Sequence, residues 1–168
     1  NEPVHHVPFL FNRLGMPSLD PKWTLRTLSE TLSRQSDRLV GNEDVGQMSA
    51  WYVLAAAAYI DMPGDGRYEI TSPVFDRVEF RLDPAYAAGG SFVIEARDNS
   101  PENIYIQSAT LNGKKYDKCY LTHDDLAAGG TLVLQMGVKP SIGEKIDRMI
   151  PFGGEAFSGF TLSRPEIG

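Results

Sequence analysis

The sequence contains a single cysteine, Cys119, among its 168 residues. One thiol cannot build an internal disulfide framework, and it excludes a zinc site made of several cysteines. Basic residues are also scarce: 16 Lys and Arg stand against 22 Asp and Glu, the net charge is -6, and no basic run occurs. These counts argue against nucleic acid and against a membrane surface as partners, and they leave neutral ligands such as sugars open.

A hydrophobic run long enough to cross a bilayer is absent too. The longest candidate, residues 51–60, is about half of the roughly 20 residues that a membrane span needs. The chain opens with residues 1–6, NEPVHH, which contain no initiator Met and neither the basic nor the apolar region of a signal peptide. We therefore expect that the protein has been processed or that the sequence is a piece of a longer chain.

The amino-terminal third is predicted to be helical. Apolar residues recur at steps of three and four over residues 4–14, and Pro8 favours a regular helix that starts near it. A second helix is expected to begin at Asp20 as N-cap, with Pro21 in the first helical position. A third is expected over residues 45–60, and its apolar character nearly all round is typical of a helix buried against several neighbours.

From Pro63 onward the hydrophobic period changes to two, which predicts β-strands. Strands are expected over residues 78–82, 92–96, 104–111, 114–120 and 131–136. Asn112-Gly113 is a strong hairpin signal between two of them. Thr122 followed by Asp125 has the spacing of a capping box, which predicts a one-turn helix.

Two near copies of one motif, residues 87–90 and 127–130 (both AAGG), each precede a predicted strand. We interpret them as two turns with similar geometry. The whole pattern predicts an α+β fold, with a helical segment over residues 1–62 and a small antiparallel β region over residues 63–168.

The densest polar cluster stands directly before the apolar helix and contains Asn42, Glu43, Asp44 and Gln47. A helix amino terminus stabilises negative charge, so the carboxylates suit this position. One interpretation is a capping box between Asp44 and Gln47. The other makes one carboxylate a general base, held ionised at the mouth of a pocket.

A second polar cluster opens the chain with Asn1, Glu2, His5 and His6. If this segment is helical, Glu2 and His6 share a face and could converge on a metal or a substrate. A solvated or structural role is the alternative. The sequence lacks the His-Glu-x-x-His, Gly-rich phosphate-loop and Gly-x-Ser-x-Gly motifs of other enzyme classes.

Three motifs follow one another along the chain: residues 1–12 (NEPVHHVPFLFN), 41–53 (GNEDVGQMSAWYV) and 99–113 (NSPENIYIQSATLNG). In this order they resemble glycoside hydrolase family 92 over roughly residues 1–137. This family comprises calcium-dependent, exo-acting α-mannosidases, many of them α-1,2-mannosidases. The resemblance also favours a bacterial protein that is periplasmic or secreted.

The resemblance implies an inverting hydrolysis of a terminal α-1,2-linked mannose in a glycan. Inversion needs two carboxyl groups about 6.5–9.5 Å apart, an acid for the leaving group and a base for the attacking water. By resemblance, Asp44 is the general base, and Glu43 and Asn42 orient it or share the water.

The same resemblance implies a calcium ion that binds two adjacent mannose hydroxyls and helps to distort the sugar ring. Asn1, Glu2 and Asp44 are the expected calcium ligands. Glu2 is also expected to bind substrate, together with His6 and Gln47. Calcium takes six to eight oxygen ligands, so three side chains leave room for waters and sugar hydroxyls.

In the family, the helices belong to an (α/α)6 barrel, and the segment that carries the acid precedes the Asn-Glu-Pro motif. We therefore expect the helical segment to be part of an incomplete barrel whose partner is the upstream part of the same parent chain. The isolated chain is expected to be inactive.

Two alternatives remain open. The β region could be a carbohydrate-binding module that presents Tyr105, Tyr116 and Tyr120 to a glycan, although strand aromatics commonly serve packing. The chain could also be a structural domain without a ligand. In that case the uncovered apolar helix faces would favour a homodimer.

Overall fold

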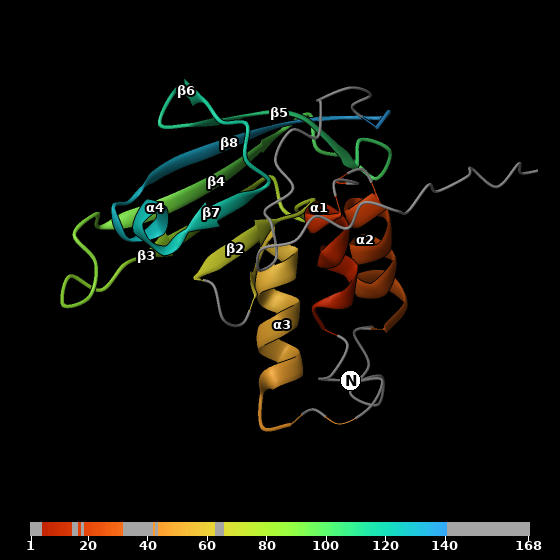
Figure 1. Ribbon diagram of the computed structural model, residues 1–168, viewed down its shortest axis with the longest axis horizontal. Coiled ribbons are helices and arrows are strands. Elements are labelled where there is room, and N and C mark those ends of the chain that lie inside the picture. Colours follow the sequence, from red (N-terminus) through yellow and green to blue (C-terminus); the bar gives the residue numbers. More distant parts are fainter. Residues whose placement is uncertain are drawn as a thin grey trace, which may run out of the picture.

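The computed structural model describes residues 5–14, 17, 19–31, 42, 44–62 and 66–140. A group of helices lies beside two β-sheets, and the long sheet extends away from the helices (Figure 1). The described part is therefore α+β, as the sequence predicts.

The helical part begins with a 3-10 turn, η2 (Val7–Phe9), that runs directly into α1 (Leu10–Arg13). Pro8 lies in this first turn, where a missing N–H costs nothing, so the predicted start near Pro8 is confirmed. Helix α2 (Leu19–Thr31) begins one residue before Asp20. Asp20 is therefore inside the first turn and not at the predicted N-cap.

Helix α3 (Gln47–Ala56) is shorter than predicted. The expected continuation to residue 60 is wrong because Ala58 adopts a left-handed backbone conformation, with φ of 79°. This conformation turns the chain, and Tyr59–Met62 forms strand β1 instead. The helical segment predicted for residues 1–62 thus contributes its last four residues to a sheet.

The smaller sheet has three antiparallel strands in the order β1-β2-β7. Strand β2 (Arg67–Ile70) occupies the centre, and β7 (Tyr120–Thr122) lies on its other side. The predicted return strand over residues 114–120 is therefore split: only β6 (Lys114–Lys115) pairs back onto the hairpin, and β7 belongs to the smaller sheet.

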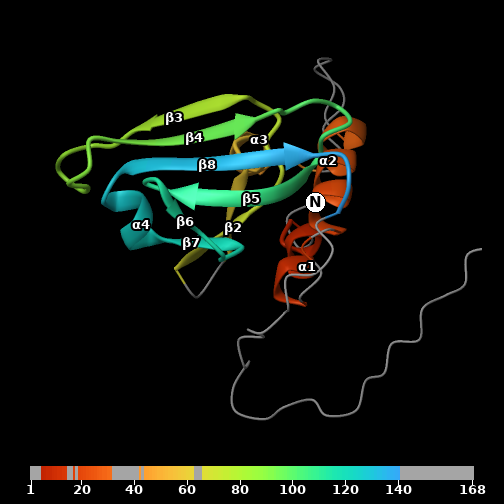
Figure 2. The same ribbon diagram turned by 90° about the horizontal axis from the view of Figure 1, so that it is seen from above.

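The larger sheet has five strands in the order β3-β4-β8-β5-β6 (Figure 2). In addition to β6, its members are β3 (Arg77–Arg81), β4 (Ser91–Arg97), β5 (Tyr105–Leu111) and β8 (Gly130–Gly137). Strand β8 runs parallel to β4 and antiparallel to β5. The prediction of a wholly antiparallel region is wrong, because β8 returns through the smaller sheet and α4 (His123–Ala127) and inserts between β4 and β5.

Two local predictions in this region are confirmed. Asn112 and Gly113 both have positive φ, 52° and 77°, as a type I′ hairpin turn requires. Thr122 caps α4: its hydroxyl accepts from the Asp125 N–H, and the Asp125 carboxylate accepts from the Thr122 N–H at 2.9 Å.

The described part of the protein has two hydrophobic cores. One lies between the two sheets, and the other lies among the helices. The first contains alternate residues of the long central strands together with residues in or next to the smaller sheet: Ala58, Ile70, Phe92, Ile94, Ala96, Leu121, Leu132, Leu134 and Met136. The second joins η2, α2, α3 and β1: Phe9, Leu28, Trp51, Ala55 and Ile60. Burial in the second core fixes where α3 lies relative to the amino-terminal residues.

The two AAGG motifs lie against each other, and the Gly89 N–H donates to the Ala127 carbonyl at 3.1 Å. Their geometry differs in detail from the prediction of similar turns: the left-handed residue is Gly90 in one motif, whereas Gly129 and Gly130 both have positive φ in the other. A Cβ atom on Gly89 would collide with the backbone of the second motif. The sequence similarity therefore reflects close approach of two turns.

We expect Gly89→Ala to lower the free energy of unfolding by ~2 kcal/mol or more, because backbone atoms must move to accept the methyl group. Gly90→Ala is the matched control, since a Cβ there meets nothing within 4 Å and the cost is the left-handed backbone alone. Urea unfolding of both variants measures the difference. An equal or smaller loss for Gly89→Ala would contradict the close approach.

Candidate active site

The loop before α3 holds Asp44 in an unusual backbone conformation. Asp44, Val45 and Gly46 have φ of 54°, 58° and 100°, so three consecutive residues are left-handed. This conformation suits Gly and is tolerated by Asp, but it is an outlier for β-branched Val45. The Val45 side chain is fully exposed, so burial does not offset the strain. Strained backbone of this kind gathers at functional sites, where the surrounding structure holds it in place.

The predicted capping box between Asp44 and Gln47 is wrong. Gly46 is the N-cap of α3, and no side chain caps this helix. The Gln47 N–H instead faces the backbone carbonyl of Asp44, at 3.4 Å. The half-buried Asp44 therefore stands before the amino end of α3 without a capping role.

The other predicted site residues fall into two groups. Asn42 and Gln47 are exposed beside Asp44, and His6 is exposed at the start of η2. Asn1, Glu2 and Glu43 lie outside the described residues, and their roles stay predictions.

His5, from the first polar cluster, packs on helix α3 through Trp51. The Trp51 indole N–H donates to the His5 backbone carbonyl at 3.1 Å, and the two rings stack with centroids 5.1 Å apart. The His5 imidazole also contacts the sulfur of Met48, in the first turn of α3. The segment that follows the Asn-Glu-Pro motif therefore packs directly on the helix that Asp44 precedes.

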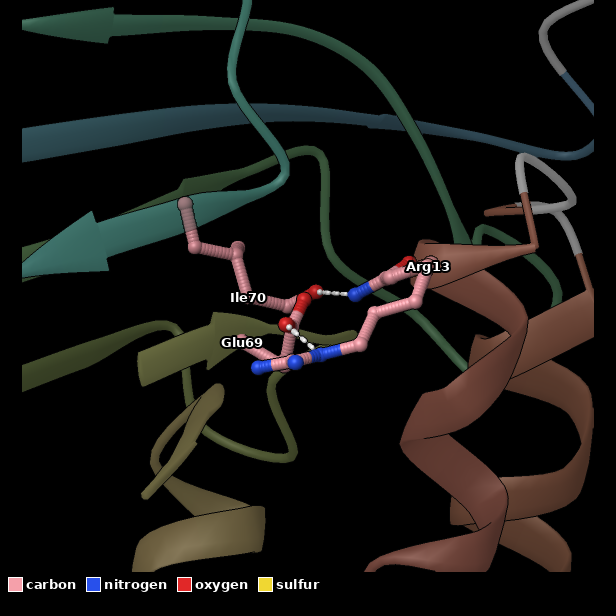
Figure 3. Close-up of polar contacts among 4 residues, drawn as sticks. Arg13, Glu69 and Ile70 are labelled. Atoms are coloured by element: carbon pink, nitrogen blue, oxygen red, sulfur yellow. Dashed lines mark hydrogen bonds and ion pairs between the residues drawn. The ribbon is translucent and has the colours of Figure 1, made fainter. Parts of the chain in front are cut away.

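Two polar contacts fix α1 against strand β2. Arg13 reaches from α1 to Glu69, and the Nε–Oε1 distance is 3.1 Å (Figure 3). Asn12 donates to the Ile70 carbonyl at 3.0 Å. The Glu69 side chain is only 4% exposed, so the ion pair with Arg13 offsets part of the cost of burying its charge.

Asp20 is a buried carboxyl that sequence analysis interpreted only as a cap. Its Oδ1 accepts from the Thr24 hydroxyl at 2.7 Å, and the Thr71 hydroxyl lies 3.4 Å away. Burial raises the pKa of Asp20 to about 7, and the negative charge of Glu69 adds to the shift. The side chains of Thr24, Thr71 and Asn12 lower it only in part. No sequence motif signals this burial, which depends on the contact of α2 with Thr71, 51 positions along the chain.

A small pocket of about 100 Å³ opens where the helices meet strand β5. Its walls include Asn12, Pro21, Tyr105, Gln107 and Tyr116, and Asp44 is not among them. It is therefore separate from the predicted sugar site.

Two of the three tyrosines of the carbohydrate-binding alternative, Tyr116 and Tyr120, make contacts within the protein. The Tyr116 hydroxyl donates to the Tyr120 carbonyl at 2.8 Å, and burial raises the pKa of Tyr116. The Tyr120 ring lies under the Arg67 guanidinium, 4.4 Å from its centroid. These contacts favour the packing interpretation over a glycan-binding surface.

Within the described ranges, no group of three or more His, Cys, Asp or Glu side chains could hold a metal ion. Asp44 is the single expected calcium ligand that these ranges contain. The expected set of two carboxylates and an amide has the oxygen donors that calcium prefers.

Comparison with known proteins decides the family. Residues 1–138 match the model of the glycosyl hydrolase family 92 catalytic domain. The chain belongs to this family. The resemblance predicted from the three motifs is confirmed.

Family 92 relatives of known structure share this fold. An α-mannosidase from Bacteroides thetaiotaomicron matches with a TM-score of 0.76 and 37% sequence identity, over 83% of this chain and 18% of that chain. That enzyme has also been solved in complex with mannoimidazole. An inverting family 92 mannosidase from the same bacterium matches with a TM-score of 0.74 and 36% identity, over 84% of this chain and 19% of that chain.

A relative described as an uncharacterized secreted glycosidase comes from the fungus Arthroderma benhamiae. It is 31% identical over 160 residues, which is 88% of this chain and 21% of that protein. The chain thus spans about a fifth of the length of its family 92 relatives. None of the helices in the described ranges is both long and apolar enough to span a membrane.

Proposed function

We propose that this chain carries the general base and part of the sugar site of an inverting exo-α-mannosidase. The observation that carries the proposal is the packing of His5, which follows the Asn-Glu-Pro motif in sequence, on the helix that Asp44 precedes. His5 and α3, which each follow a motif rich in oxygen donors, are thereby in direct contact.

Asp44 would accept the proton of the attacking water. Its loop holds the carboxylate at the amino end of α3, and a base must be ionised to act. Glu43 and Asn42 would orient Asp44 or share the water. Inversion is supported by the description of one family 92 relative as an inverting mannosidase.

The terminal sugar would bind to Glu2, His6 and Gln47, and calcium would bind to Asn1, Glu2 and Asp44. Bound calcium would hold two adjacent mannose hydroxyls and favour a distorted ring. A mannose unit as substrate is supported by the complex of one relative with mannoimidazole. The α-1,2 linkage is proposed from the resemblance of the three motifs.

The general acid would lie upstream in the parent chain, on helices that complete an (α/α)6 barrel. Exposed apolar side chains on the helices support such a covering: Leu14, Trp23 and Val53 are 63%, 41% and 58% exposed. Alone, the chain would bind mannose weakly, turn it over hardly at all, and could dimerise through these faces. We also propose a secreted or periplasmic parent, since one relative is described as secreted.

Hydrolysis of α-1,2-linked mannobiose tests this proposal, with the chain as given beside the same chain extended upstream, each with calcium and with a chelator. We expect activity only in the extended, calcium-loaded protein. Calcium-dependent activity of the short chain would contradict an upstream acid. Inactivity of both proteins towards every α-mannobiose would contradict the mannosidase assignment.

A further inference from the structure

Helix α2 turns a largely polar face towards the rest of the protein. Asp20, Thr24 and Leu28 follow one another at steps of four, so they share one side of the helix, and all three are buried. Of these three, only Leu28 belongs to a hydrophobic core. The neighbouring helix α1 contains no buried residue. Polar contacts therefore provide much of the attachment of α1 and α2 to the β region.

Asp20 stands where these polar contacts meet. Its Oδ1 accepts from the Thr24 hydroxyl in α2 and lies 3.4 Å from the hydroxyl of Thr71, which directly follows β2. The side chain of Asn12, in α1, hydrogen-bonds to Asp20 and also donates to the Ile70 carbonyl at the end of β2. One carboxyl group thus connects α1, α2 and the chain that leaves β2.

The surroundings of Asp20 suit a neutral carboxyl group better than a charged one. Its side chain is fully buried, and its second oxygen makes no hydrogen bond within the described residues. The charged side chain that acts on it is Glu69 of β2, which has the same sign, and Arg13 of α1 pairs with Glu69 at 3.1 Å (Figure 3). The groups that face Asp20 from α1, α2 and residue 71 are uncharged. Burial and the charge of Glu69 raise the pKa of Asp20 to about 7.

The junction between the helices and the β region is also loosely filled. The pocket of about 100 Å³ lies over it, between Asn12 and Pro21 of the helices and Tyr105 and Gln107 of β5. Side chains beside such a void lose contacts on that side. The core between the two sheets is instead filled by apolar side chains from both sheets. This contrast favours opening of the helix junction before opening of the sheets.

We propose that Asp20 is a proton-operated latch: its neutral carboxyl group holds α1 and α2 against β2, and loss of its proton lets this junction open while the two sheets stay closed. Water solvates the carboxylate in the open form, so the open form releases the proton that the closed form binds. Opening therefore becomes easier as the pH rises from 3.8 towards 7, and the effect levels off above 7. This inference goes beyond the proposed function and does not depend on it.

Amide hydrogen exchange of the full-length protein that contains this chain tests the latch, with each rate corrected for its intrinsic value at the same pH. We expect the protection factors of α1 and α2 to fall by ~10-fold between pH 6 and pH 8, because the closed form keeps most of its proton at pH 6 and has lost it at pH 8. At each pH they should lie at least ~10-fold below those of β4 and β8. Equal protection of the helices and of these strands would mean that the whole protein opens at once, and the latch would be wrong.

Asp20→Asn keeps the shape of the side chain and removes its titration. In this variant we expect the protection factors of α1 and α2 to be the same at pH 6 and pH 8. Asp124→Asn is the matched control at an exposed carboxylate, and it should keep the ~10-fold fall of the wild type. If the fall persists in Asp20→Asn, Asp20 is not the group that operates the junction.

Two further variants should move the pH dependence in opposite directions. Thr24→Val removes a hydroxyl that lowers the pKa of Asp20, and Glu69→Gln removes a negative charge that raises it. The pH at which the protection factors level off should therefore rise in Thr24→Val and fall in Glu69→Gln. A merely structural role would change protection at every pH without moving this point. If Asp20→Asn does not fold, a wild-type levelling point in both variants overturns the proposal.

Discussion

Asp44→Asn in the full-length protein is expected to lower kcat for an α-1,2-linked mannoside by ~10³-fold or more. The amide cannot accept a proton from the attacking water, and general base catalysis contributes roughly 10²–10⁴-fold. Asn has nearly the shape of Asp and tolerates the left-handed conformation at this position, where φ is 54°. The fold should therefore survive, and steady-state kinetics beside circular dichroism checks both statements.

Two control variants make this result specific. Asp124→Asn makes the same change at an exposed carboxylate in the first turn of α4, and wild-type kcat is expected. Glu43→Gln separates the two adjacent carboxylates of the motif. Near-normal turnover in Asp44→Asn would contradict its assignment as base, and a large loss in Glu43→Gln alone would transfer the role to Glu43.

Local signals predicted much of the fold. The Asn112-Gly113 turn, the Thr122–Asp125 cap and the alternation along β4 and β8 depend on residues close in sequence, and the structure has all three. The parallel pairing of β4 with β8 does not depend on any local signal. It follows from the path of the chain through β7 and α4 between them, which a hydrophobic period cannot reveal.

The carboxyl-terminal end of α3 was also not predictable from local sequence. The alanine run over residues 55–58 has high helix propensity, so the sequence favoured continuation to Ile60. In the structure Ile60 is buried in the core with Phe9 and Trp51, and β1 pairs with β2. Tertiary packing and strand pairing therefore override the local preference.

The sequence predicts two separate polar clusters, and it does not predict that His5 packs on α3. Trp51 fits the pattern of a buried apolar helix, and His5 stands out only as a neighbour of Glu2. The contact between them spans 46 positions in sequence, so no spacing rule signals it. Arg13 and Glu69 form an ion pair across 56 positions and were missed for the same reason.

The second large effect is expected at Asp20, where the wild type should lose stability as the pH rises. Its folded-state pKa is raised from 3.8 to about 7, so between these values the folded protein binds a proton that the unfolded chain has released. The contribution is fully present below pH 3.8 and lost as the pH rises through 7. Between pH 5 and pH 8 this amounts to roughly 2–3 kcal/mol.

The groups around Asp20 support a raised pKa. Glu69, on β2, forms an ion pair with Arg13 at 3.1 Å, and the negative charge of Glu69 opposes ionisation of Asp20. The side chains that hydrogen-bond to Asp20 are the hydroxyls of Thr24 and Thr71 and the uncharged amide of Asn12, which do not neutralise a carboxylate. One carboxyl oxygen of Asp20 and the Ser72 hydroxyl make no hydrogen bond in the described part of the chain. An ionised Asp20 is therefore poorly compensated.

Asp20→Asn removes the titrating group and keeps an acceptor for Thr24. We expect the variant to gain stability relative to the wild type as the pH rises from 5 to 8, by roughly the same 2–3 kcal/mol. Urea unfolding across this range measures the difference, and Asp124→Asn, at an exposed position, should leave the pH dependence of the wild type unchanged. Parallel curves for Asp20→Asn and the wild type would mean that Asp20 ionises in the folded protein as readily as in the unfolded chain.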